Sequence, residues 1–292
     1  MGDLMHALPA ITEAKDQINN ITFDWVVDKS FSSVPNWHPG VTNIIETNHR
    51  EWKFNLFSTK SREEIRKVIN RIDESDYDLI VDMQNNLKSA FLSYMCKSSV
   101  IGLDAKSARE YPAHLAYKNK IRVSKEMHAI ERQKLLLASA LGYETNIENN
   151  DYGISKVNFK KPLEMPSYNY AICVQNASWI TKQWPIESWK ELLRILEKRD
   201  INLLFPSGNQ AEFDRANEIC SVSEKALALE VLPLNEIAFL IDNSEFTLCS
   251  DTGLAHLSAV VGTPSLTLYG PTDTRLIGTY GENQNHFVSP DS

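Results

Sequence analysis

The sequence predicts an α/β protein in which two domains with parallel sheets face a central cleft. Its 292 residues suffice for two domains, since single cores stop growing at roughly 250–300 residues. Short apolar, β-branched segments alternate with helical patterns in both halves, which is typical of parallel sheets. The stretch 151–168 is polar and irregular, which is typical of a linker. Residues 1–150 and 169–292 are therefore the predicted domains.

The first half contains strand and helix patterns in alternation. The predicted strands are residues 21–27, 77–83 and 99–104. A helix is predicted over 61–72, where Ser61 and Glu64 have the spacing of a capping box. A second helix is predicted over 128–143, and it should end at Gly142.

The second half repeats this alternation with more strands. The predicted strands are residues 169–175, 201–208, 225–231, 245–251 and 264–270. Between them, apolar residues at helical spacing follow Pro185, and a further helix is predicted over 254–261. Ligands of such folds bind beyond the carboxyl ends of the strands, so polar residues just after strands are the candidate site residues.

The composition is that of a soluble globular protein, with 42% hydrophobic and 23% charged residues. No apolar run approaches the ~20 residues that a membrane span needs, and no export signal is present. The four cysteines form no CxxC pair, so reduced thiols and a cytoplasmic location are expected.

Basic residues are concentrated in one part of the chain, although the net charge is −8. Residues 106–134 contain Lys106, Arg109, Lys118, Lys120, Arg122, Lys125, Arg132 and Lys134 against three acids. A solvated helix face explains such a run, and so does a patch for an anionic partner.

The stretch "SDTGLAHLSAVVG" places Asp251, Thr252 and Gly253 between a predicted strand and a predicted helix. The first N–H groups of a helix lack internal partners and carry partial positive charge. Thr252 is a possible cap, and Gly253 lets an anion approach the backbone, so this corner is a candidate phosphate site. Asp251 would then accept hydrogen bonds from sugar hydroxyls. Plain N-capping by Asp251 or Thr252 is the alternative.

Two further stretches follow strands in the same half. In "WITKQWPIESW", Thr181 and Lys182 precede a helix, and Lys182 is either a diphosphate ligand or a surface lysine. In "FPSGNQAEFDRA", Glu212 lies in the first helical turn, where the helix dipole alone would stabilise a carboxylate. The functional alternative for Glu212 is a hydrogen bond to a ribose diol.

Two more candidates lie near helix starts. Asp3 opens a helix in "MGDLMHALPA", as a cap or as a general base, and His256 either contacts a phosphate or packs in its helix. The histidines have no metal-ligand spacing, and no GxGxxG, P-loop or GxSxG motif occurs. Dinucleotide oxidoreductase, P-loop kinase and α/β-hydrolase activities therefore lack support.

Taken together, these stretches resemble the lipopolysaccharide heptosyltransferases of glycosyltransferase family 9. "SDTGLAHLSAVVGTPSLTLYGPTDTRLIGTYGENQ" resembles their carboxyl-terminal signature. "MGDLMHALPAITEA", "VDMQNNLKSA", "SARE" and "MHAIERQKLLLASALGY" resemble first-domain blocks of the members that add the first heptose. The similarity covers nearly the whole chain, with the motifs in order.

The resemblance implies an inverting glycosyltransferase of the GT-B type, with two Rossmann-like domains. The second domain would hold ADP-heptose, and the first would present Kdo-lipid A at the cytoplasmic face of the bacterial inner membrane. The basic stretch around Arg109 would then meet the anionic acceptor. The resemblance implies no metal, no other cofactor and no nucleic-acid partner.

Roles follow from matching positions in the family's motifs. Asp3 matches the catalytic base, and Lys182 matches the lysine that neutralises the departing diphosphate. Thr181, Thr252, Gly253 and His256 match the phosphate-binding region, with Asp251 towards the heptose and Glu212 towards the ribose. Within "HREWKF", Arg50 and Lys53 match the arginine-rich acceptor loop, although Glu51 lies between them.

The chain departs from the family pattern in two further places. In "DMQNNLKSA", Asn85 replaces a glycine, and Asn tolerates left-handed backbone better than most residues. The chain is also expected to lack the family's first strand and last helix. The alternatives left open are a sister enzyme that adds a later heptose, an inactive nucleotide-sugar-binding relic and an unrelated lipid-A-binding protein.

Overall fold

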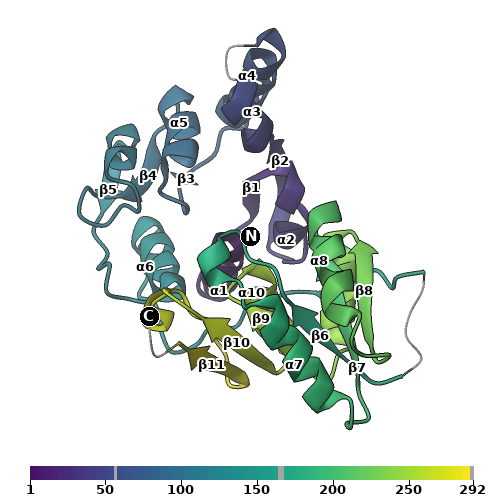
Figure 1. Cartoon of the computed structure of the whole chain (residues 1–292). Helices are drawn as coiled ribbons and strands as arrows, with labels where there is room; N and C mark the ends of the chain where they lie inside the picture. Colours follow the sequence, from purple (N-terminus) through teal and green to yellow (C-terminus); the bar gives the residue numbers. More distant parts are fainter. Residues whose placement is uncertain (56–57, 164–167, 290–292) are drawn as a thin grey trace. The chain divides into compact units, whose positions relative to one another are not determined.

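The computed structural model describes residues 1–55, 58–163 and 168–289 as an α/β chain (Figure 1). It divides into two compact units. The first comprises Met1 and Asp3–Ser155, and the second comprises Gly2 and Lys156–Ser292. Residues 164–167 of the expected linker and 290–292 of the second expected domain lie outside the described residues.

The first unit carries two parallel sheets and the helices around them. Its helices are α1 (Gly2–Gln17), α2 (Ser33–Asn36), α3 (His49–Asn55), α4 (Thr59–Glu74), α5 (Leu87–Met95) and α6 (Ala129–Leu141), with 3-10 turns η1 (Lys29–Phe31) and η2 (Tyr111–Ala116). One sheet pairs β1 (Phe23–Asp28) with β2 (Val41–Thr47). The other has the order β3 (Ile80–Val81), β4 (Val100–Leu103), β5 (Asn119–Ile121).

Helix α1 is held in this unit by apolar packing and by the ion pair between Glu13 and the buried Lys134 of α6. Ala10, Ile11 and Ala14 form a cluster with Leu137 of α6. The packing fixes the axis of α1, and therefore the position of the residues in its first turn.

Helix α4 begins differently from the expectation, whereas helix α6 ends where it was expected to end. Helix α4 begins at Thr59 and not at Ser61, because Ser58 is its N-cap and accepts the Ser61 N–H at 3.1 Å. Glu64 forms no capping box, since its carboxylate accepts the indole N–H of Trp52 at 2.8 Å. The expected end of α6 is confirmed: Gly142 follows it in left-handed conformation, with φ 80°.

Other differences concern strands that the residue pattern does not mark. The strand expected over 77–83 is reduced to β3, and the chain bends at Met83 and Gln84 beyond it. Strands β2, β5 and β11 (Gln284–Val288) were not expected. Each of them carries polar residues on exposed positions and pairs at the edge of its sheet, so their apolar content is low.

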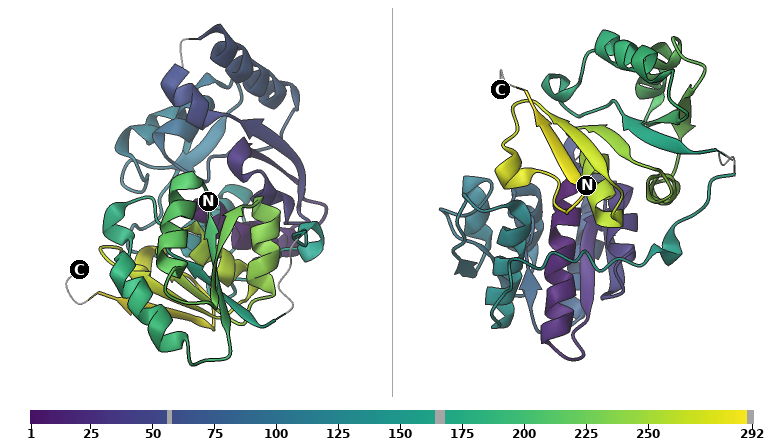
Figure 2. Two further views of the ribbon diagram at one scale, coloured as in Figure 1. Left: turned by 45° about the vertical axis from the view of Figure 1, so that its right-hand side comes forward. Right: turned by 90° about the horizontal axis from the view of Figure 1, so that it is seen from below.

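The second unit is a doubly wound parallel sheet. Its strands are β6 (Tyr170–Val174), β7 (Asn202–Ser207), β8 (Ala226–Val231), β9 (Thr247–Ser250), β10 (Ser265–Tyr269) and β11. Their order is β11-β10-β9-β6-β7-β8, so the chain starts in the middle, builds one side and then crosses to the other (Figure 2). The five strands expected from the sequence are all present.

Helices cover both faces of this sheet. They are α7 (Ile186–Leu196), α8 (Gln210–Cys220), α9 (Leu234–Asp242), α10 (Gly253–Val261) and α11 (Thr274–Ile277), besides the turns η3 (Lys156–Asn158) and η4 (Ile180–Lys182). Trp189 of α7 and Ile219 of α8 pack against Cys173 and Phe205 on one face. On the other face, the Tyr170 hydroxyl donates to the Leu240 carbonyl of α9 at 3.0 Å.

Candidate functional site

The candidate site of the second unit lies at the point where the strand order reverses. Strand β6 lies between β9 and β7, and all three are parallel, so their carboxyl ends meet at one edge. The loop after β6 can therefore contact the loops after β9 and β7. In doubly wound sheets, ligands bind in the crevice at this reversal.

Lys182 and Asp251 are brought together at this edge. Lys182, in η4 after β6, places its Nζ 2.6 Å from Oδ2 of Asp251, which follows β9. The Asp251 side chain is 7% exposed and that of Lys182 is 23% exposed. The hydroxyl of Thr272 donates to the same Oδ2. Both partners therefore contact the same carboxylate oxygen, Oδ2.

The start of α10 provides backbone donors next to Asp251. Thr252 occupies the N-cap position, but its side chain makes no capping hydrogen bond, so the expectation that Thr252 caps with its hydroxyl is wrong. The backbone of Thr252 is extended, with φ −150° and ψ 171°, which is the usual conformation of an N-cap residue. Gly253 and Leu254 are partly exposed and begin the helix. Their N–H groups lie in the part of the helix where an anion is stabilised.

His256 lies one turn further along α10 and is partly buried.

Thr181 is exposed on η4, and its carbonyl oxygen lies 3.1 Å from the place that a Cβ on Gly270 would take. The bare backbone of Gly270 thus lets η4 approach the end of β10. A larger residue at Gly270 would push the Lys182 turn outward.

Glu212, on the first turn of α8, is held by the loops around it. Its Oε2 accepts the Gly208 N–H at 2.8 Å and the Asn176 amide at 2.9 Å, and its Oε1 accepts the Asn209 amide at 3.0 Å. The carboxylate therefore joins the loop after β6 to the loop after β7. It keeps acceptor capacity on Oε1, as a sugar diol would require.

Asn176 and Thr272 belong to this arrangement but were not among the sequence candidates. Asn176 is two residues beyond β6, and Thr272 lies in "LYGPTD" just after β10. The placement of both after strands was a usable signal. What the sequence lacked was the identity of their partners, Glu212 and Asp251, which lie on other loops.

The candidate site of the first unit centres on Asp3, in the first turn of α1. Arg109 donates from Nη1 to Asp3 Oδ2 at 2.6 Å, and Gln84 donates from its amide to the same oxygen at 3.5 Å. Gln84 follows β3 and Arg109 follows β4, so the carboxyl ends of two neighbouring strands supply both donors. Among the described residues, both of these donors reach Oδ2. Gln84 was not singled out, although it lies in the quoted block "VDMQNNLKSA".

A buried turn holds Gln84 in place. The Asp82 carboxylate accepts the N–H groups of Gln84 and Asn85, each at 2.9 Å, and the Tyr117 hydroxyl at 2.7 Å. Burial raises the pKa of Asp82 above its usual value, partly offset by the hydrogen bonds from Asn85 and Tyr117. Asn85 has φ 52°, which confirms that an asparagine supports the left-handed backbone of this loop.

The basic stretch of the first unit is not one exposed patch. Lys134 is fully buried; its ammonium group donates to the carbonyls of Asn146 and Asn149 and lies 3.5 Å from the Glu13 carboxylate. Lys134 therefore joins α6 to α1 and does not meet a ligand at the surface. Arg132 is partly buried, and burial together with the charge of Arg109 lowers its pKa.

Arg50 and Lys53 lie on helix α3, whereas the family resemblance predicted a loop for this stretch. Trp52 is the buried residue of this helix. Arg50 is exposed, and its guanidinium lies 4.7 Å from the centre of the Phe31 ring. Lys53 is also exposed and lies 5.8 Å from the Phe54 ring centre.

Two general features of the described chain bear on the site. Within residues 1–55, 58–163 and 168–289, no three or more His, Cys, Asp or Glu side chains are grouped so that they could hold a metal ion. No helix in the same ranges has the length and apolar character needed to cross a membrane.

Comparison with known proteins gives consistent matches. Residues 65–292 match the model of glycosyltransferase family 9 (heptosyltransferase). Lipopolysaccharide heptosyltransferase 1 of Pseudomonas aeruginosa is 38% identical over 290 residues, covering 99% of this chain and 81% of the relative. The enzyme of the same name from Escherichia coli K12 is 36% identical, covering 97% and 89%.

Among solved structures, the E. coli heptosyltransferase WaaC with ADP superposes with a TM-score of 0.91 at 34% identity, covering 100% of this chain and 91% of that one. The same enzyme with ADP-2-deoxy-2-fluoro heptose gives 0.88 at 33% identity, with the same coverage. These matches extend over both units and share the parallel-sheet fold described above. The chain belongs to glycosyltransferase family 9, the heptosyltransferases.

Proposed function

We propose that this chain is the heptosyltransferase that adds the first heptose of the lipopolysaccharide inner core. It would move L-glycero-D-manno-heptose from ADP-heptose to a Kdo hydroxyl of Kdo-lipid A, with inversion at the anomeric carbon. The observation that carries the proposal is the Lys182–Asp251 pair beside the open start of α10, at the strand reversal of the second unit. Relatives solved with ADP and with an ADP-heptose analogue support this choice of donor.

The donor would bind in the second unit, residues 169–292. Its diphosphate would accept hydrogen bonds from the first N–H groups of α10 near Gly253, with Thr181 and His256 beside it. Lys182 would turn from Asp251 to the diphosphate and neutralise the charge that develops when the sugar–phosphate bond breaks. Glu212 would accept hydrogen bonds from the ribose diol.

Asp251 would then bind the heptose. When Lys182 moves to the diphosphate, Asp251 keeps the Thr272 hydrogen bond on Oδ2, and Oδ1 can accept a sugar hydroxyl. In the pair described above, the lysine compensates a nearly buried carboxylate.

The acceptor would bind in the first unit, residues 1–150, with 151–168 as the connection. Asp3 would take the proton from the attacking Kdo hydroxyl, whose oxygen forms the new bond to the anomeric carbon as ADP leaves with the bonding electrons. Arg109 and Gln84 hold Oδ2, so Oδ1 is the basic atom in this scheme. Arg50, Lys53 and the exposed part of the 106–134 stretch would contact the anionic acceptor, at the cytoplasmic face of the inner membrane.

Mass spectrometry of Kdo-lipid A after incubation with ADP-heptose and this chain tests the reaction. We expect a gain of one heptose. Asp3→Ala should lower the rate by at least about 10²–10⁴-fold, the usual contribution of a general base, while ADP-heptose affinity by calorimetry stays near the wild-type value. Asp16→Ala is the matched control, since Asp16 is an exposed carboxylate on the same helix.

The acceptor series separates the alternatives. Transfer to an acceptor that already carries heptose, and not to Kdo-lipid A, would show a later-acting sister enzyme. Donor binding without transfer to either acceptor would show a nucleotide-sugar-binding protein. Wild-type rates in Asp3→Ala would remove Asp3 from the mechanism.

A further inference from the structure

Helix α5 of the first unit is apolar on two sides. Ala90 and Leu92 are buried on its inner side. The opposite side exposes four large apolar residues at the spacing of one helical face, namely Leu87, Phe91, Tyr94 and Met95. A surface helix normally presents polar residues to solvent, so the outer stripe of α5 needs a separate explanation.

The 3-10 turn η2 extends this stripe. Tyr111 and Leu115 are each 70% exposed. The backbone N–H of Leu87 donates to the Glu110 carboxylate at 2.8 Å, which ties the start of α5 to the start of η2. Beneath them, Ala90 of α5 and Ala113 of η2 share one buried cluster with Val100 and Tyr117. The six exposed apolar residues are called the α5–η2 face below.

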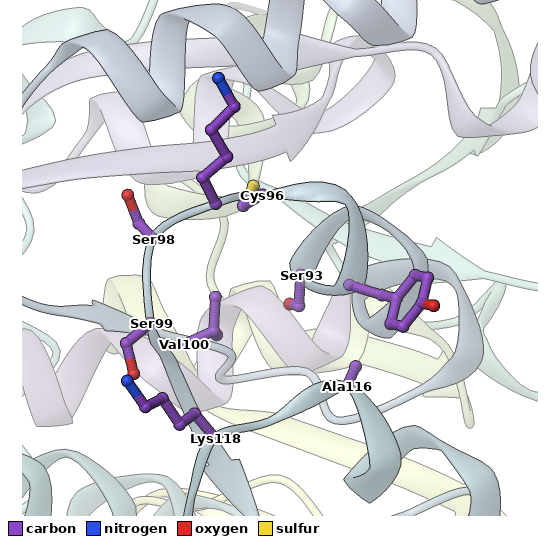
Figure 3. Close-up of a pocket in the computed structure, with 9 residues that line it drawn as sticks. Ser93, Cys96, Ser98, Ser99, Val100, Ala116 and Lys118 are labelled. Carbon is purple, nitrogen blue, oxygen red and sulfur yellow. The ribbon is translucent and has the colours of Figure 1, made fainter.

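A polar pocket of about 210 Å³ opens beside Tyr94 on this face (Figure 3). Its wall includes Ser93, Ser98, Ser99, Lys97 and Lys118, and no carboxylate. Figure 3 shows Ser98, Ser99 and Lys118 on one side of the pocket and Ser93 and Ala116 on the other. Hydroxyl and ammonium groups at such a wall are suited to phosphate oxygens.

The local charge is positive although the chain as a whole carries −8. Residues 87–103 and 111–125 contain Lys88, Lys97, Lys118, Lys120, Arg122 and Lys125 and no Asp or Glu. Four carboxylates flank or contact these segments and keep their negative charge, namely Asp73, Asp104, Glu110 and Glu126; Asp73 accepts the Lys97 N–H at 2.9 Å, and Glu110 accepts the Leu87 N–H. The six cations of the two segments outnumber these four carboxylates, so the local charge is positive.

We propose that the α5–η2 face docks on the surface of a bilayer that contains anionic phospholipid. Its apolar side chains enter the boundary between headgroups and acyl chains, while Lys97, Lys118 and the pocket serines meet lipid phosphates. A second copy of this chain is a poorer occupant, because a two-fold contact would set these lysines against each other. The inference rests on the proposed function, in which the acceptor is a membrane lipid.

Sedimentation with vesicles tests the docking without any donor or acceptor. We expect wild-type protein to bind vesicles of phosphatidylcholine mixed with phosphatidylglycerol, to bind pure phosphatidylcholine more weakly, and to be released by salt. Tyr94→Ser with Leu115→Ser should lower the partition coefficient roughly tenfold or more, because two apolar side chains are lost. Ile195→Ser is the matched control, since Ile195 is 64% exposed on α7 of the second unit.

The charge contribution is tested with Lys97→Gln and Lys118→Gln together. Each lysine near an anionic leaflet contributes about a fivefold factor, so the pair should lower binding about 25-fold. Lys67→Gln with Lys198→Gln removes the same charge from exposed positions on α4 and near α7, and should leave binding within about twofold.

Transfer assays distinguish a failure of docking from a failure of the proposed function. The Tyr94→Ser, Leu115→Ser variant should keep its rate on a Kdo acceptor without acyl chains and lose rate on Kdo-lipid A in vesicles. Equal vesicle binding by the wild type and both face variants would overturn the docking proposal. The docking proposal would also be overturned if the wild type self-associated without binding vesicles and the face variants lost that self-association. Absence of transfer by the wild type to both acceptors would instead overturn the proposed function.

Discussion

Asn85 provides a stringent test of the first-unit site, because two opposing effects meet in one residue. Its left-handed backbone, with φ 52°, favours glycine, the residue expected there from the family resemblance. Its side chain, however, donates to the Asp82 carbonyl at 2.6 Å and accepts the Leu103 N–H at 2.6 Å, with 2% of the residue exposed. The substitution Asn85→Gly removes both hydrogen bonds while relieving the backbone.

The sizes of these effects decide whether Asn85→Gly stabilises or destabilises the first unit. Relief of the left-handed conformation favours glycine by about 1 kcal/mol, and the greater freedom of the unfolded chain opposes it by about 0.4–1 kcal/mol. These two contributions nearly cancel. The buried Leu103 N–H loses its acceptor, which costs about 1–3 kcal/mol. We therefore expect Asn85→Gly to destabilise the first unit by about 2 kcal/mol, although it places glycine where the backbone prefers it.

Asn20 is the matched control, since it also has a left-handed φ, 63°, but is exposed. Asn20→Gly should change stability by less than about 0.5 kcal/mol, because only the two cancelling contributions act. Native-state hydrogen exchange of the slowest peptides in the first unit measures both variants without requiring the two units to unfold together. We expect exchange about 30-fold faster in Asn85→Gly, following the conversion of 1.4 kcal/mol per tenfold. Equal changes in the two variants would refute the reasoning.

Three further predictions concern the two sites and the pH dependence of stability. Lys182→Met should lower ADP affinity, measured by calorimetry, and lower the initial rate of transfer about 10²–10³-fold. Adding Asp251→Asn should restore stability but not the transfer rate, because the buried carboxylate that needed a cation is gone. Arg109→Gln should lower kcat, since Asp3 loses its ion-pair partner, whereas Arg66→Gln, at an exposed position on α4, should not; unchanged kcat in both would exclude a positioning role for Arg109. Burial and the charge of Lys15 lower the pKa of His38 to about 4. As the pH drops from 6.5 towards 4, His38 is therefore protonated in the unfolded state but not in the folded state, and the free energy of unfolding should fall by about 3 kcal/mol. Urea unfolding of His38→Gln should lack that loss, and an identical pH profile in both proteins would contradict the assignment.

The neutral form of His38 has a clear structural basis. Its Nδ1 accepts the Gly40 N–H at 2.9 Å, and its Nε2 lies 3.0 Å from the Thr12 hydroxyl, which donates to the Leu8 carbonyl. Protonation of Nδ1 would break the bond to Gly40 in a position that is 3% exposed. The ring therefore stays neutral until the folded state is well into the acid range.

Much of the fold followed from the sequence because it depends on neighbours in the chain. The alternation of apolar strands and amphipathic helices, and the left-handed Gly142 that ends α6, are set by backbone conformation and local side-chain spacing. The position of Lys182, Glu212 and Asp251 just after strands was also evident, since parallel strands place such residues at one edge.

Only the tertiary structure decided which partner each of these groups has. The run 106–134 shows Lys134 as one of several cations, but folding buries it against Glu13, more than a hundred residues away. Lys182 and Asp251 pair across two loops, and Ser58 rather than Ser61 caps α4 because Glu64 is drawn to Trp52. The sequence by itself determined the strand and helix pattern and the positions of the candidate groups. Burial and contacts between distant segments determined their partners, because the free energy of a charge or a hydrogen bond depends on which groups the fold places beside it.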